Sequence, residues 1–466
     1  MAGETATQQT SLTVEKHGID HIPEDQRHGG PGNQFTIRFA PVVYLAAIVL
    51  GGVSIPLGLG LAGTVTAIVV GNVLGSIATA ACAVMGPRLG MPQILMGRAA
   101  YGYRGNYIPA VLTSLLYIGY YTVGTVLGSK ALASLTHLPF VPVVIVVAAL
   151  SILIATYGYN LLHFLSKWIT RLSIVVLVVV SFVMIFHGAG PGAAGQLSGV
   201  KYWLVWLLEF TIVFSYTMSW APYASDYSRY LPVRTSRKKI FGWAFAGLFA
   251  ATTWMMVLGA ALTTVSVKGG VLDALPAVLP GALLQIVLIT LGVSAIPHNS
   301  VNLYSFALAS LTWDMPLRRT LTVILTGVVG CVLALTFGGG PNFQDYFNQF
   351  LFLISYYIMP WLAILCLDFF WKHRGGRDYP APDAFYRKDG ELGGVKWAGL
   401  LSFVLGIVVS IPFMATNLYV GPIGHALDGA DLSYFVSFIV AGVAYALVGK
   451  PATRIVAATD KATAAP

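Results

Sequence analysis

The residues best suited to bind a ligand gather in one apolar segment, Ser215 to Tyr230, which reads SYTMSWAPYASDYSRY. Tyr216 and Trp220 offer flat aromatic faces on which a planar ring can stack. Ser219, just before Trp220, offers a hydroxyl that can donate or accept a hydrogen bond. Pro222 follows and removes a backbone donor, so we expect a helix that is interrupted beside these side chains.

A second polar cluster lies in another apolar segment, Ala295 to Tyr304. His298, Asn299 and Asn302 put donors and acceptors within one helical turn, because positions three and four apart share a face. Such amide edges can read a planar polar ligand. Hydrogen bonding between buried helices is the alternative, and the sequence leaves both interpretations open.

A third apolar segment contributes aromatic rings and small residues. Tyr120 and Tyr121 lie near its middle, beside Gly119 and Gly124. Rings above and below a heterocycle would hold it by stacking. We therefore predict that both tyrosines and Gly124 line a ligand site, although most of the 23 tyrosines must serve packing.

Ionisable residues are rare in the apolar segments, which makes them candidates for function. Glu209 lies about two turns into the segment that carries Trp220. Asp226 and Arg229 lie three residues apart at the end of that segment, and we interpret them as an ion pair at a helix end. A role in an inner gate is the alternative for this pair.

The elements that must position these residues are membrane-spanning helices. The chain is 56% hydrophobic and 10% charged, which is typical of a polytopic membrane protein. Apolar runs of about 20 residues predict an all-α protein with twelve spans. The spans are centred near Ile48, Gly75, Tyr117, Ala149, Val176, Phe210, Leu258, Thr290, Val328, Ile358, Val404 and Val440.

Two of the predicted spans are interrupted. Span 1 contains Pro41, Gly51, Gly52 and Pro56, and span 6 has its polar break near Ser219. Interruptions at matching positions in two halves predict a binding site at an inverted-repeat interface. We expect repeats at about 35–187 and 202–371, extra helices at about 396–449, and cytoplasmic tails at 1–34 and 450–466. Residues 371–395 read as a polar, solvated connector.

The basic residues are distributed unevenly along the chain. All Lys and Arg except Lys130, Lys201 and Lys268 fall in segments on the side of the N-terminus. This is the positive-inside pattern, so the net charge of +9 sets topology and does not indicate nucleic-acid binding. We expect a multi-pass protein of the cell (inner) membrane with both termini in the cytoplasm.

Signatures of enzymes are absent from the sequence. It contains no phosphate-binding Gly-rich loop with Lys-Ser/Thr and no HExxH. The three cysteines lie far apart inside apolar runs, so we expect neither a disulfide framework nor a metal site. We predict a transporter without a cofactor, in which uphill transport uses an ion gradient.

Four sequence blocks resemble the purine-cytosine permease branch of the nucleobase–cation symporter family. They are HGIDHIPEDQRHG with NQFTIRF, MGPRLGMPQILMGRAAYGYRGNYIPA, SWAPYASDYSRYLP, and NSVNLYSFAL with SYYIMPWLAILCLDFFW. The resemblance runs from about residue 17 to 448. It implies a LeuT-like 5+5 inverted repeat with two further helices, and ion-coupled import of a nucleobase by alternating access.

The resemblance also implies roles for single residues. Trp220 matches the tryptophan of the span 6 motif, with Ser219 and Tyr216 at the same break. Asn302 matches the span 8 asparagine, and His298 stands where fungal relatives usually have asparagine. Departures from the family pattern are Tyr120 in place of tryptophan, Gly124 in place of a side-chain amide, and the segment Ala40 to Tyr44, where asparagines are frequent. These departures put cytosine itself in doubt.

The coupling ion is H⁺ or Na⁺. Sodium-coupled relatives bind the ion with span 1 carbonyls, which here implies Val42 and Leu45, and with span 8 hydroxyls. Ser294 supplies one hydroxyl and Val293 supplies none, which favours protons with Glu209 or His298 as carriers. Another small heterocycle, such as a hydantoin, allantoin or a vitamin ring, is the alternative substrate. A channel is a less favoured alternative, because the polar groups cluster at breaks.

Overall fold

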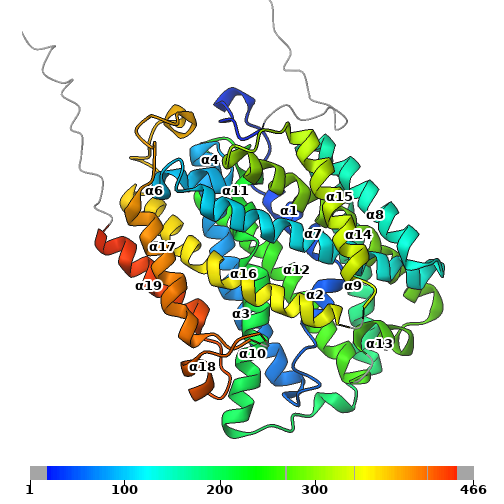
Figure 1. Cartoon of the computed structure of the whole chain (residues 1–466). Coiled ribbons are helices and arrows are strands. Elements are labelled where there is room, and N and C mark those ends of the chain that lie inside the picture. The colour runs from blue at the N-terminus through cyan, green and yellow to red at the C-terminus, as the bar shows by residue number, and fades with distance from the viewer. Residues whose placement is uncertain (1–17, 268–269, 341, 417, 449–466) are drawn as a thin grey trace, which may run out of the picture.

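The protein folds into a bundle of helices (Figure 1). The computed structural model describes residues 18–267, 270–340, 342–416 and 418–448. Within these ranges there is no strand, only an isolated bridge between Ala415 and Val420. The prediction of an all-α protein is therefore confirmed for the described part of the chain.

Nine helices in the described ranges are long and apolar enough to cross a membrane. They are α3 (Gly60–Ala83), α7 (Tyr107–Thr136), α8 (Phe140–Tyr157), α9 (Tyr159–His187), α10 (Gly199–Met218), α12 (Arg237–Val265), α14 (Gly281–Thr312), α15 (Arg319–Phe337) and α16 (Phe343–Cys366). Two shorter apolar helices, α17 (Trp397–Ser410) and α19 (Ser433–Val448), pack together along one flank (Figure 1). These lengths and compositions indicate a multi-pass membrane protein.

The remaining helices are short. They are α1 (Asn33–Phe39), α2 (Leu45–Leu50), α4 (Met85–Leu89), α5 (Gln93–Met96), α6 (Arg98–Tyr101), α11 (Ala224–Ser228), α13 (Gly270–Val278) and α18 (Pro422–Ala426). Every predicted span centre lies in a helix, and the first of them, Ile48, lies in α2.

Both predicted interruptions are present in the structure. A 3-10 turn, Ala40–Val42, follows α1, and Tyr44 is extended with φ −140° and ψ 171° before α2 begins. The helix α10 ends at Met218, and a 3-10 turn, Ala221–Tyr223, leads into α11. Each break frees backbone groups at a depth where only protein or a polar cavity can satisfy them.

Small residues bring the broken helices close to their neighbours. A Cβ at Gly71 of α3 would lie 2.9 Å from Val213 of α10, and a Cβ at Gly75 would lie 2.8 Å from Thr217. Asn72 accepts a hydrogen bond from Thr217 Oγ1 at 2.5 Å. Close glycine contacts of this kind are typical of helix packing in membranes.

One end of the molecule is covered by two segments, the 371–395 connector and residues 18–32. The 371–395 connector is solvated only in part: most of its residues are exposed or half-buried, whereas Phe385 and Leu392 are fully buried. Residues 18–32 precede α1 and also pack on the body, with Ile22 donating to Gly90 O at 2.9 Å. Residues 1–17 and 449–466, the rest of the two expected tails, lie outside the described residues.

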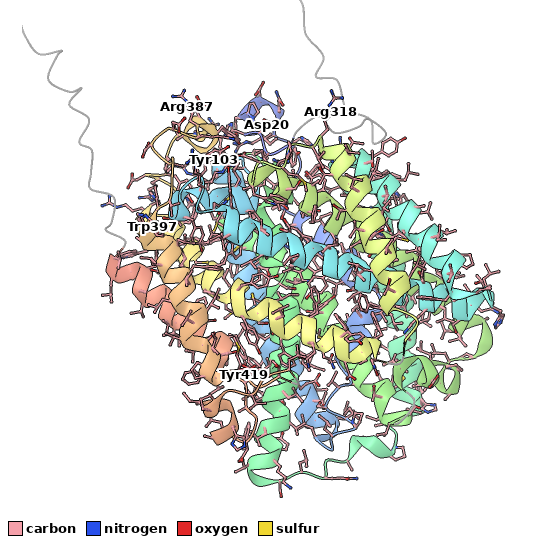
Figure 2. All side chains as sticks on the ribbon, in the orientation of Figure 1. Asp20, Tyr103, Arg318, Arg387, Trp397 and Tyr419 are labelled. Atoms are coloured by element: carbon pink, nitrogen blue, oxygen red, sulfur yellow. The ribbon has the colours of Figure 1, made fainter. Side chains whose placement is uncertain are left out.

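We call this end the basic face. It carries the 371–395 connector, residues 18–32 and the loops around Arg98, Arg229 and Arg318. Figure 2 shows Asp20, Tyr103, Arg318 and Arg387 together at this end, whereas Tyr419 lies toward the other end.

Candidate functional site

Five side chains meet where the span 6 break passes between α7 and α14. They are Tyr120 of α7, Ser219, Trp220 and Tyr223 at the break, and His298 of α14. None is more than 5% exposed. They fill the space that they enclose, with a free volume of about 0 Å³. A ligand can therefore enter this central site only when side chains or helices move.

The imidazole of His298 ties α14 to the break in span 1. Its Nδ1 lies 2.9 Å from Pro41 O, and its Nε2 lies 3.2 Å from Asn302 Nδ2. A carbonyl oxygen can only accept and an amide nitrogen can only donate, so Nδ1 carries the proton and Nε2 accepts. The ring also stacks on Tyr44, with centroids 4.1 Å apart.

The two asparagines of α14 differ in how fully they are bonded. Asn302 donates to His298 O at 2.9 Å and accepts from the Tyr223 hydroxyl at 2.6 Å. Asn299 donates to Thr125 Oγ1 at 3.0 Å, whereas its buried Oδ1 has no partner in the described part of the chain. A ligand that uses Asn302 Oδ1 must displace the hydroxyl of Tyr223, whereas Asn299 Oδ1 is free to accept a hydrogen bond.

A chain of hydroxyls joins α7 to the break. The Tyr120 hydroxyl lies 2.8 Å from Ser219 Oγ, which donates to Tyr216 O at 2.6 Å. The rings of Tyr120 and Tyr216 are 6.0 Å apart at an angle of 80°. The Trp220 ring lies 5.9 Å from His298. Aromatic faces and polar edges therefore alternate around the central site, as stacking and hydrogen bonding of a planar ring require.

Gly124 and Tyr121 lie in different surroundings, although the sequence grouped them. A Cβ at Gly124 would lie 2.1 Å from Asn299 Oδ1 and 2.7 Å from His298 Cδ2, so this glycine lets the polar cluster of α14 approach α7. Tyr121 faces α15 instead, where a Cβ at Gly330 would lie 2.3 Å from its ring. The structure therefore does not bring Tyr121 to the central site, because successive helical residues point about 100° apart.

The predicted coupling residues fall into two places. Ser294 is buried and lies four residues before His298, on the face of α14 that meets span 1. At the span 1 break, Val42 O accepts from Tyr44 N at 2.8 Å, and Leu45 begins α2. Glu209 lies ten residues before Ser219 on α10, about 15 Å along the helix, so it is not part of the central site.

Sequence reasoning missed three residues that shape the central site. Tyr44 stacks on His298, Thr125 bonds Asn299, and Tyr223 bonds Asn302. Tyr223 stands three residues after Trp220 in the same motif, and Tyr44 lies in the break of span 1, so both could have been found by following aromatics at the breaks. Thr125 carries no such pattern.

Asp226 and Arg229 lie at the basic face and outside the central site. Asp226 accepts from Gln93 N at 3.0 Å and Ser305 Oγ at 2.6 Å. Arg229 donates to Gly18 O at 2.9 Å. Asp226 joins α5 and α14 to the end of span 6, and Arg229 joins the N-terminal segment to it, which agrees with a structural role at a helix end.

The surroundings of the central site differ on its two sides. On the side away from the basic face, Phe350 of α16 separates Tyr120 from a pocket of about 280 Å³ between α7, α15 and α16, with ring centroids 5.2 Å apart. On the side of the basic face, a small cavity of about 10 Å³ lies next to Trp220 and Tyr223. Arg38 and Tyr227 also line it.

Comparison with known proteins extends these findings. Residues 21–437 match the family model described as permease for cytosine/purines, uracil, thiamine, allantoin. The Bacillus subtilis protein YxlA is 30% identical over 94% of this chain and 97% of its own length. The purine-cytosine permease FcyB of Emericella nidulans is 24% identical over 93% of this chain and 88% of its own.

The fold is shared with a solved transporter. Mhp1, a nucleobase-cation-symport-1 family transporter in a closed conformation with bromovinylhydantoin bound, superimposes with a TM-score of 0.73. The two chains are 18% identical, and the match covers 93% of this chain and 94% of Mhp1.

Proposed function

This chain belongs to the family of permeases for cytosine/purines, uracil, thiamine and allantoin, and from that premise we propose that it imports a nucleobase by ion-coupled symport. Membership makes it a transporter rather than an enzyme. The substrate class, the coupling and the direction are our proposal.

One observation carries the proposal. The two interrupted spans meet at a buried site that combines the rings of Tyr120 and Trp220 with His298 of α14. In the same polar cluster, Asn299 Oδ1 lies beside Gly124 and has no hydrogen-bond partner among the described residues. A cytosine or purine is flat and has ring N–H or exocyclic amino groups. Its faces suit the aromatic rings, and its donors suit Asn299 and, after displacement of the Tyr223 hydroxyl, Asn302.

The architecture that we propose is the LeuT-like one. It has twelve crossings, an inverted repeat of spans 1–5 and 6–10, and two further helices. The broken spans 1 and 6, which would be the first members of the two repeats, support this assignment. The charge distribution supports a cytoplasmic location for the basic face and both termini. Alternating access would then open the central site first to the outside and later to the cytoplasm.

We propose that the coupling ion is H⁺ rather than Na⁺, and that no cofactor takes part. Between span 1 and α14, a sodium ion would use the carbonyls of Val42 and Leu45 and hydroxyls of α14. Val293 beside Ser294 supplies no hydroxyl, which favours the proton. Uptake measured at fixed pH with and without Na⁺ tests this choice, and an absolute Na⁺ requirement contradicts it.

Binding of bases by the purified protein tests the substrate class. We expect cytosine or a purine to raise the melting temperature, since a ligand that binds only the folded state stabilises it. The matched variant Tyr223→Phe should bind the base several-fold more tightly, because the base no longer competes with the tyrosine hydroxyl for Asn302. Weaker binding by this variant would mean that the hydroxyl itself contacts the base.

A second candidate is a heterocycle with a different ring, such as a hydantoin, allantoin or a vitamin ring. The family description, which includes allantoin and thiamine, supports this candidate. Tyr120 and Gly124, which differ from the residues that the family pattern has at these positions, support it as well. Competition of labelled cytosine uptake by a panel of these compounds separates the two candidates. A channel is disfavoured because the polar groups cluster at the two breaks, and currents far above carrier turnover would revive it.

A further inference from the structure

Two buried carboxyl groups on the side away from the basic face are bonded very differently. Asp431 receives hydrogen bonds from Tyr356 Oη at 2.7 Å, Ala415 N at 3.0 Å, and Ser433 N and Oγ at 2.9 and 2.5 Å. Glu209 is fully buried and receives one, from Ser54 N to Oε2 at 2.9 Å. Its Oε1 has no partner among the described residues.

No positively charged side chain on the helices packed against α10 offsets the small number of hydrogen bonds to Glu209. The polar groups that act on it belong to Ser54, whose hydroxyl lies 2.8 Å from Thr64 Oγ1. The packed helix α3 contains no Asp, Glu, Lys, Arg, His or Tyr. The titratable groups of the other helices near α10 are the tyrosines, Asp345 and Cys366 of α16 and the tyrosines of α19. No cation faces Glu209 from these elements, and a buried carboxylate without a cation is a costly charge, whereas a neutral carboxylic acid is not.

The position of Glu209 links this chemistry to the broken spans. Ser54 lies in the turn that follows α2, at the end of span 1 away from the basic face. The hydrogen bond therefore joins that end of span 1 to α10, the first part of span 6. Packing of this turn on α10 buries the carboxyl group, and separation of the two would expose it to water.

We propose that Glu209 is the proton-binding residue of the transport cycle. It takes a proton from water on the side away from the basic face. The neutral acid then lets the turn after α2 pack on α10, which closes that side. When the basic face opens, the rearrangement of α10 connects the carboxyl group to water on that side, and this water takes the proton. This inference rests on the proposed proton-coupled import.

The variant Glu209→Gln tests the inference, because a glutamine carbonyl can still accept from Ser54 N but cannot bind a proton. In proteoliposomes with a gradient of one pH unit, one proton per substrate sustains accumulation of about tenfold. We expect the variant to retain base binding and exchange of preloaded base but to lose this accumulation, so that the ratio falls to about one. Accumulation at the wild-type ratio would overturn the assignment and leave nucleobase import intact.

Two further measurements keep the inference testable. Asp431→Asn removes another buried carboxyl group, and we expect it to lower the melting temperature without abolishing pH-driven accumulation in the folded fraction. A hydrophobic carbodiimide, which reacts with protonated carboxyl groups in apolar surroundings, should label wild-type Glu209. Absence of labelling would overturn the inference even if Glu209→Gln fails to fold. A wild-type protein that takes up no base would instead count against the proposed function.

Discussion

The central site is closed by different kinds of contact on its two sides. Away from the basic face, the ring of Phe350 lies between Tyr120 and a pocket of about 280 Å³. Toward the basic face, residues 18–32, the loop from α4 to α6 and the 371–395 connector cover the end of span 6. One barrier consists of side-chain packing, and the other of backbone segments held by hydrogen bonds.

This difference determines what each side needs in order to open. A single aromatic side chain can change rotamer on a picosecond-to-nanosecond scale when it is not tightly packed. The basic face opens only if several loops separate together, which breaks buried hydrogen bonds of Arg98 and Arg229. More hydrogen bonds must therefore break to open the basic face than to move the ring of Phe350.

The largest effect is expected for Arg98→Ala. Arg98 is buried and donates to Phe385 O at 2.5 Å and Thr312 O at 2.6 Å, so the change leaves two carbonyl groups without donors. We expect a loss of about 3 kcal/mol of stability, measured as a lower melting temperature. Arg387→Ala, in the same connector but exposed, is the control and should melt like the wild type. Equal melting temperatures of the two variants would show that the closure of the basic face does not depend on these hydrogen bonds.

Gly86→Ala tests the packing of the same barrier. A Cβ at Gly86 of α4 would lie 2.1 Å from Ser228 Oγ and 2.8 Å from Arg229 N. We expect a cost of about 1–3 kcal/mol from overpacking, together with faster labelling of introduced cysteines from the basic face. At Gly242 of α12 a Cβ would meet nothing within 4 Å, so Gly242→Ala is the matched control and should be neutral or stabilising. A neutral Gly86→Ala would contradict tight closure of this face.

Phe350→Ala tests the barrier on the side away from the basic face. Its ring covers Gly119, and removal should join the pocket to the central site. In a background without the native cysteines, Ser219→Cys should then react with a small thiol reagent about tenfold faster from the side away from the basic face. Phe337→Ala is the control, because Phe337 lines the same pocket but is 44% exposed. An unchanged rate for Phe350→Ala would mean that other groups form this barrier.

The smallest effect concerns the pH dependence of the basic face. Partial burial works to raise the pKa of Asp314, but hydrogen bonds from Tyr107, Lys388 and Tyr103 outweigh it, so this pKa lies below its ordinary value of 3.8. The contribution to stability is therefore fully present above pH 3.8 and is lost as the pH falls through the lowered pKa. The difference in melting temperature between the wild type and Asp314→Asn should stay constant from pH 8 to 5. A difference that shrinks between pH 7 and 5 would contradict this assignment.

Local sequence patterns predicted the helices and their breaks better than the tertiary contacts that the residues make. The break near Ser219 follows from Pro222 and the polar residues beside it, and the structure has it there. The burial of Phe385 was not predicted, because a polar connector with prolines gives no sign that Arg98, far away in the chain, donates to its backbone. Tyr120 and Tyr121 looked equivalent in the sequence, and only the rotation of α7 against α14 and α15 separates them.

The sequence by itself determined the class of the protein, the helical segments and the two interruptions, because hydropathy and proline act on the residues that carry them. Only the tertiary structure decided which side chains face one another. It placed Tyr44 on His298, Tyr223 on Asn302 and Ser54 on Glu209. These contacts join residues that are distant in sequence, and their geometry depends on helix packing that no local pattern encodes.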